Sequence, residues 1–116
     1  MNRKQRRTEK KSSGHYARGE KLYAEGLKAF QAGQPLLAAE RLEQAIRAGP
    51  ASPVFHMHLG LAQSAVGRAR EAEASFRQAL ELQPDYFEAK ANLANLLWVQ
   101  GRVDEAEAGY TAILTF

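Results

Sequence analysis

The stretch that decides the fold is residues 56–84, which reads HMHLGLAQSAVGRAREAEASFRQALELQP. Small and apolar residues recur at helical spacing on both sides of Gly67. A glycine at this place is typical of a helix end, and Pro84 closes the second apolar pattern. The stretch therefore predicts two short helices joined by a tight turn, that is, one helical hairpin.

The same pattern recurs at an interval of 34 residues along the chain of 116. A fixed period of this length, shared by several columns of residues, is the mark of a repeat array. We therefore predict repeats at 19–52 and 53–86 and an incomplete third repeat at 87–116, each folded as two helices. The columns are Gly33, Gly67 and Gly101; Ala38, Ala72 and Ala106; Gly26, Gly60 and Ala94; Leu42, Phe76 and Tyr110; Ala45, Ala79 and Ile113; and Pro50 with Pro84.

The second repeat resembles the tetratricopeptide repeat, and it matches the pattern of that family through Leu59-Gly60, Ala72, Phe76 and Pro84. The resemblance covers residues 19–116 in about three repeats. It implies an all-α fold, a right-handed superhelix of antiparallel helix-turn-helix hairpins. The small residues of the columns let the two helices of a hairpin approach closely, and the large ones fill the space between hairpins.

The resemblance implies a non-catalytic scaffold that binds a peptide or protein in a concave groove, which is lined by the first helix of each repeat. The groove positions that it assigns are Glu20, Tyr23, Ala24, Leu27 and Phe30; Val54, Met57, His58, Leu61 and Ser64; and Glu88, Ala91, Asn92, Asn95 and Trp98. Our candidate binding residues are Tyr23, Leu27, Met57, His58, Leu61, Asn92, Asn95 and Trp98.

Two kinds of side chain support these candidates. The amides of Asn92 and Asn95 can donate and accept at once, which suits a peptide backbone. Tyr23, Met57 and Trp98 would supply apolar anchors. Burial of Trp98 between hairpins and simple solvation of Asn92 stay open as alternatives.

Chaperone-binding members of the family hold a C-terminal carboxylate with a clamp of lysine and arginine. The corresponding positions here are Tyr23, Leu27, His58, Glu88 and Asn92. The clamp is absent, so we predict no binding to the acidic C-terminal tails of heat-shock chaperones.

Positive charge is concentrated at the N-terminus. Residues 1–18 hold seven basic residues against Glu9 alone, a net charge of +6, whereas the remaining nine basic and 12 acidic residues give −3. We predict a disordered, solubilising tail at 1–18. RNA or anionic lipid stays open as a ligand of this segment, but no aromatic residues are interleaved to stack on bases, so nucleic acid is not the expected partner. The candidate anion contacts are Arg3, Lys4, Arg6, Arg7, Lys10 and Lys11.

The residue types exclude most catalytic chemistry. The chain has no cysteine, which rules out disulfides and thiol nucleophiles. His56 and His58 are two residues apart, so on a helix their side chains point about 200° apart and do not share an ion. No glycine-rich phosphate loop or nucleophile elbow is present. We expect no enzyme activity, no cofactor and no metal.

The two ends of the chain carry further expectations. No apolar stretch approaches the ~18–20 residues of a membrane span, so we expect a cytoplasmic protein. The last repeat ends at residues 113–116, three of which are apolar (Ile113, Leu114 and Phe116). This predicts self-association through an uncapped C-terminal helix, or a fragment of a longer array. The alternative function is the substrate-recruiting arm of a glycosyl-, sulfo- or methyltransferase. The opening of residues 1–7 is similar to that of bacterial repeat proteins with a transferase domain downstream. A lesser alternative is an RNA-associated protein.

Overall fold

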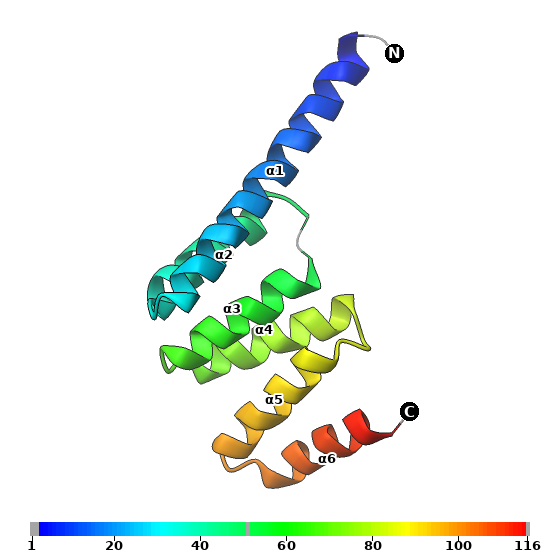
Figure 1. Cartoon of the computed structure of the whole chain (residues 1–116). Coiled ribbons are helices and arrows are strands. Elements are labelled where there is room, and N and C mark those ends of the chain that lie inside the picture. Colours follow the sequence, from blue (N-terminus) through cyan, green and yellow to red (C-terminus); the bar gives the residue numbers. More distant parts are fainter. Residues whose placement is uncertain (1–2, 51, 116) are drawn as a thin grey trace.

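The computed structural model describes residues 3–50 and 52–115, and the side chains of residues 17–50 and 52–115. These residues form six α-helices and no strand. The helices are α1 (Arg3–Gln31), α2 (Pro35–Ala48), α3 (Pro53–Ala65), α4 (Ala69–Leu82), α5 (Phe87–Val99) and α6 (Val103–Leu114). Consecutive helices pair into three hairpins that stack in chain order (Figure 1). The all-α superhelix of helical hairpins is confirmed.

The turn inside each hairpin depends on one glycine. Gly33, Gly67 and Gly101 have φ angles of 77°, 84° and 78°, in the left-handed region that L side chains avoid. The backbone N–H of the residue after each glycine donates to a carbonyl near the end of the preceding helix. In the second hairpin, Arg68 N–H donates to the carbonyl of Gln63 at 2.9 Å. This bond satisfies a carbonyl that the helix end would otherwise leave without a donor. The glycine column is therefore a requirement of the backbone.

The other small residues are a requirement of packing. Ala38, Ala72 and Ala106 have no exposed surface. Gly60 of α3 faces the ring of Phe76 on α4 so closely that a Cβ atom would lie 2.5 Å from Cε1 of the ring. In the third hairpin the glycine lies on the second helix instead. Ala94 of α5 takes the place of Gly60, and Gly109 of α6 faces it so closely that a Cβ at Gly109 would lie 3.1 Å from that of Ala94.

One buried hydrogen bond joins the helices of the second hairpin. The hydroxyl of Ser75 on α4 donates to Oε1 of Gln63 on α3 at 2.6 Å, and both residues are buried. A buried polar group left without a hydrogen-bond partner costs more free energy than a formed hydrogen bond contributes. The pair therefore favours one register of α3 against α4.

The backbone of α1 differs from the expectation at the N-terminus. Helix α1 begins at Arg3, inside the segment 1–18 that the sequence predicted as a disordered tail. Arginine, lysine, glutamine and glutamate dominate residues 3–11, and all are good helix formers. The first buried residue described on α1 is Gly19, which faces the carbonyl of Ala45 and the ring of Phe55. The packed part of α1 thus begins at the predicted start of the first repeat, and the mobility of the tail stays a prediction.

In the part of the chain that the structure describes, no helix combines the length and the apolar character that crossing a bilayer requires.

Candidate peptide-binding groove

The stacking of the hairpins places the first helix of each pair on one side. The backbone of helix α3 approaches those of both α1 and α5, whereas among the described residues no Cα atom of α2, α4 or α6 lies within 8 Å of a Cα atom of another of these three helices. Figure 1 shows the hairpins α1–α2, α3–α4 and α5–α6 stacked one after another. Because the first helices lie closer together than the second ones, they form the inner side of the curve. The groove positions belong to these three helices.

Tyr23 and His58 link the first two repeats across this side. The ring of Tyr23 stacks on that of the buried Phe55, with centroids 4.5 Å apart and planes 16° apart. Its hydroxyl lies 3.1 Å from Nδ1 of His58, which also lies 3.0 Å from the carbonyl of Val54. A carbonyl only accepts, so we place the proton on Nδ1, with both oxygens as acceptors. These contacts hold both side chains in place.

Burial and acidic groups act on the phenol of Tyr23. Burial is the main reason why the pKa of Tyr23 is raised, and the charges of Tyr86, Glu20 and Glu88 raise it further. Burial and Glu88 likewise raise the pKa of Tyr86. Glu88 lies in the first turn of α5. A tyrosine with an ordinary pKa of about 10 is already protonated at neutral pH, so the raised pKa values leave both phenols neutral.

The third repeat contributes its two asparagines in different ways. Nδ2 of the half-buried Asn92 donates to Sδ of Met57 at 3.5 Å. Asn95 is exposed, and its Oδ1 accepts a hydrogen bond of 2.6 Å from the hydroxyl of Tyr110. Within the described part of the chain, Nδ2 of Asn95 has no partner and is available to a ligand. Asn95 is thus held by the second helix of its own hairpin and presents a donor.

The structure corrects one candidate and separates the others by exposure. Met57 is only 1% exposed and packs with Ala79 and Ala89 in the core, so it supports the groove from beneath and is not a surface anchor. Leu27 and Leu61 are half-buried. Trp98 is 53% exposed, so burial between hairpins, the alternative for this residue, is wrong.

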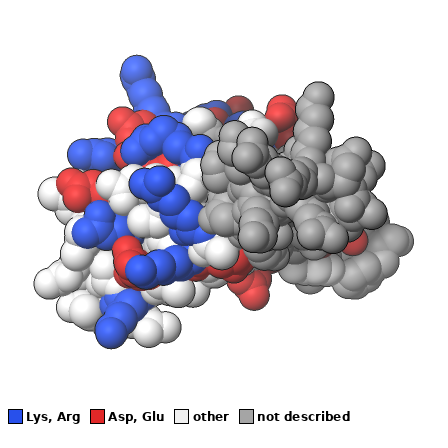
Figure 2. All heavy atoms as spheres, turned by 90° about the horizontal axis from the view of Figure 1, so that it is seen from above, with Lys and Arg blue, Asp and Glu red and all other residues white. Residues whose placement is uncertain are grey.

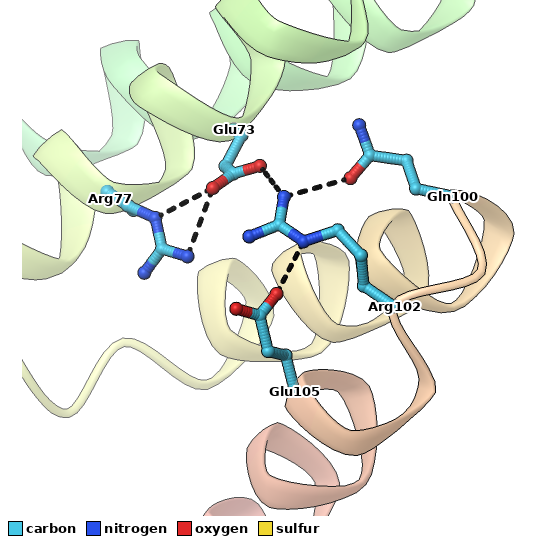
Figure 3. A network of polar contacts seen from close by, with 5 residues as sticks. All are labelled: Glu73, Arg77, Gln100, Arg102 and Glu105. Carbon is cyan, nitrogen blue, oxygen red and sulfur yellow. Dashed lines mark hydrogen bonds and ion pairs between the residues drawn. The ribbon is translucent and has the colours of Figure 1, made fainter.

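A polar network fixes the second repeat against the third. Figure 3 shows the guanidinium of Arg102, in the turn between α5 and α6, between Glu73 of α4 and Glu105 of α6. Arg102 also donates to Oε1 of Gln100 at 3.3 Å, and Arg77 donates twice to Glu73 at 3.1 and 3.2 Å. The hydrogen bond from Arg102 is the largest cause that lowers the pKa of Glu73. The network supports the angle between the hairpins, and so the curve of the groove.

In the described part of the chain, no three metal-ligating side chains lie together to hold a metal ion. Burial lowers the pKa of His56, which favours its neutral form. The candidate anion contacts at Arg3, Lys4, Arg6, Arg7, Lys10 and Lys11 lie outside the described side chains. Figure 2 shows cationic and anionic groups side by side on the part of its face that carries colour.

Sequence reasoning missed one residue near the groove. Tyr86 precedes α5, at the last position of the second repeat, outside the columns that the first helices supply. It packs half-buried against the cluster of Met57, Ala79 and Ala89. Tyr86 lies in the loop between α4 and α5, and no periodic pattern in the sequence marks it.

Comparison with known proteins agrees with this architecture. Two family models, both described as tetratricopeptide repeat, match residues 23–65 and 64–114. The chain belongs to the tetratricopeptide repeat family. A small glutamine-rich tetratricopeptide repeat-containing protein 2 of Mycosarcoma maydis is 34% identical over 94 residues, which are 81% of this chain and 27% of that protein.

A second relative is a probable biofilm formation methyltransferase, WspC, of Pseudomonas aeruginosa. It is 41% identical over 71 residues, which are 60% of this chain and 17% of that protein. Among solved structures, the second tetratricopeptide domain of Spaghetti (RPAP3), bound to the HSP90 peptide SRMEEVD, has a TM-score of 0.80 and 22% identity over 85% of this chain and 92% of that one. This chain spans about a quarter or less of the two full-length relatives.

Proposed function

We propose that the chain is a non-catalytic scaffold whose concave face binds an extended peptide or protein segment. The observation that carries the proposal is the exposed pair of Asn95 and Trp98 on α5, together with the fixed side chains of Tyr23 on α1 and His58 on α3. Asparagine offers polar groups to a peptide backbone, and an exposed tryptophan offers a large apolar anchor. Preorganised side chains lose little entropy when a ligand binds.

The clamp positions argue for a ligand other than a chaperone tail. Tyr23, Leu27, His58, Glu88 and Asn92 supply no lysine or arginine to hold a terminal carboxylate. The likeness to the HSP90-bound domain is one of fold. We expect the peptide SRMEEVD to bind this chain no more tightly than a scrambled peptide in calorimetry, and a micromolar dissociation constant would refute this expectation.

Peptide selection with matched variants tests the scaffold proposal. A phage-displayed library of random dodecapeptides is selected on the whole chain, and the selected peptides are measured against Asn95→Ala and Trp98→Ala. The control variants are Gln78→Ala and Leu36→Ala, which remove an exposed amide and an exposed apolar side chain outside the groove positions.

We expect about tenfold weaker binding to each groove variant, because hot-spot side chains contribute more than 1 kcal/mol each. The controls should bind as the wild type does. The concave face is refuted as the binding surface if the groove variants and the control variants lose the same affinity. It is also refuted if no selected peptide depends on Asn95 or Trp98.

A second candidate is that the repeats recruit substrates for a transferase domain in the same polypeptide. The match to the methyltransferase WspC favours it, since that protein is about six times longer than the matched segment. Sequencing of the gene on both sides of the codons for residues 1–116 tests this candidate. A reading frame that holds a transferase domain on either side supports it, and a frame that holds none refutes it.

A further inference from the structure

A cavity of about 370 Å³ lies between α4, α5 and α6. On α5 its lining consists of Lys90, Leu93, Ala94 and Leu97, and no groove position belongs to it. Because a helix turns by about 100° per residue, these four residues lie on the side of α5 opposite to the groove positions of that helix. The cavity is therefore separate from the candidate peptide-binding groove.

The walls of this cavity are apolar and elongated. Leu93, Ala94 and Leu97 are buried, and α4 adds the half-buried Leu80. Lys90 and Leu97 stand at the two ends of the α5 wall, about 10 Å apart along the helix axis. On α6 the lining residues are small, namely Ala108, Gly109 and Ala112, and the exposure of the two alanines opens the cavity to solvent.

The volume suits a small organic ligand. Ligand pockets are mostly apolar, carry a few polar groups and begin near 300 Å³. An engineered cavity of about 150 Å³ holds one benzene molecule. A cavity of about 370 Å³ therefore has room for roughly twice as many carbon atoms.

Three charged residues line the cavity, and two of them are already paired. Arg77 donates to Glu73, and Glu105 accepts from Arg102, in the network of Figure 3. The network holds two guanidinium groups and two carboxylates, so its charges cancel. The third charged residue of the lining, Lys90, lies outside this network.

The ammonium group of Lys90 has no carboxylate partner among the described residues. It lies 5.9 Å from the centroid of the Phe87 ring. The nearest acids in the sequence are Asp85 and Glu88, and neither lines the cavity. One end of the apolar cavity thus offers a cation that an anionic group could bind.

The second repeat has different chemistry at the same place in the register. There the buried pair of Gln63 and Ser75 forms a hydrogen bond between the two helices of the hairpin. The third repeat has Leu97 and Gly109 instead, which removes the polar groups and leaves volume. It also has Lys90 where the second repeat has a histidine. Where the second hairpin has a polar contact, the third has an apolar cavity with a cation at one end.

We propose that this cavity binds a linear aliphatic carboxylate, with its chain along Leu93 and Leu97 and its carboxylate on Lys90. Removal of the chain from water drives binding, and a charge-assisted hydrogen bond to the ammonium group fixes the orientation of the ligand. An aliphatic cation would place like charge beside Lys90. Because the cavity is separate from the groove, this inference does not depend on the proposed function.

Calorimetry on the whole chain tests the ligand class. Decanoate, decanol and decylammonium differ in the charge of the head group, and all are used below the concentration at which they form micelles. Butyrate carries the carboxylate on a chain too short to fill the cavity. The variant Lys90→Met keeps an apolar stem and removes the charge. Its control is Lys21→Met, which removes an exposed lysine of α1 that does not line the cavity.

We expect decanoate to bind about tenfold more tightly than decanol, because decanol cannot form the charge-assisted bond. Butyrate and decylammonium should bind more weakly than decanol. Lys90→Met should bind decanoate no more tightly than decanol, and Lys21→Met should bind as the wild type does. The proposal is overturned if decanoate does not bind saturably, if it shows no advantage over decanol, or if that advantage survives in Lys90→Met.

A second pair of variants tests the location. Ala112→Phe places a ring at an exposed lining position, and Thr111→Phe places the same ring at the next residue, which is exposed and outside the lining. Both decanoate and decanol should bind about tenfold more weakly to Ala112→Phe and unchanged to Thr111→Phe. Equal affinities for the two variants would overturn the placement of the ligand in this cavity.

Discussion

The close approach of α3 and α4 at Gly60 gives the sharpest prediction. A Cβ atom added at Gly60 would lie 2.5, 2.7 and 2.9 Å from three carbons of the Phe76 ring. An ordinary contact begins near 3.4 Å, so the ring would have to move by about 0.9 Å. Phe76 is 1% exposed and has no room to swing into solvent. We therefore expect Gly60→Ala to destabilise the second hairpin.

The magnitude follows from two opposing effects. Overpacking a core of native density costs about 1–3 kcal/mol. Replacing a mid-helix glycine by alanine recovers about 0.5–1 kcal/mol of helix propensity. The net loss in the free energy of unfolding should be about 1–2 kcal/mol, or a decrease in Tm of roughly 5–15 °C for a domain of this size.

Urea unfolding, followed by circular dichroism, measures this loss. The matched control is Gly26→Ala, where the added Cβ would lie 2.9 Å from Cγ of the equally buried Leu42, a smaller overlap than at Gly60; we expect a smaller loss. In Gly60→Ala/Phe76→Leu the two effects should be strongly non-additive, since the smaller side chain removes the clash. The reasoning is wrong if Gly60→Ala is as stable as the wild type, or if the two substitutions are simply additive.

Three further predictions use the same unfolding measurement. Ser75→Ala should cost about 1–3 kcal/mol, because Oε1 of Gln63 loses its donor in the core, and adding Gln63→Leu should recover most of that loss; no recovery would contradict the role of the pair. Gly67→Ala should cost about 1–2 kcal/mol from its φ of 84° alone, since no atom lies within 4 Å of the new Cβ, and Gly67→Asn should cost less. The folded-state pKa of Glu73 is lowered, so its contribution to stability is present above the unfolded value of 4.5 and is lost as the pH falls toward the folded value. Glu73→Gln should therefore lose less stability than the wild type between about pH 5 and 3, and parallel losses would argue against the ion pair with Arg102.

Much of the fold was predictable because the residue types that each hairpin requires recur in the sequence at a fixed interval. A helix end that requires a positive φ selects glycine, so Gly33, Gly67 and Gly101 mark the three turns directly. Close helix contacts select small residues, so the alanine column at 38, 72 and 106 marks the core. Such local requirements act within one hairpin, and a period of 34 residues makes them visible.

The groove was predictable only as a set of positions. Register assigned Met57 and Trp98 equally to the concave face, yet Met57 is buried and Trp98 is exposed. Which of them reaches the surface depends on how the neighbouring hairpin stacks, and this is a contact between residues 30 or more positions apart. The helical backbone of α1 from Arg3 onward was likewise not expected from a charged segment without aliphatic periodicity.

The sequence by itself thus determined the hairpins, their number and their turns, because these depend on backbone conformation and close contact inside one repeat. Only the tertiary structure decided which side chains share the groove. It stacks Tyr23 of the first repeat on Phe55 of the second and sets the hydroxyl of Tyr23 3.1 Å from Nδ1 of His58. The curvature that does so arises from packing between hairpins, where the close contact of the first helices and the network around Arg102 set the angle.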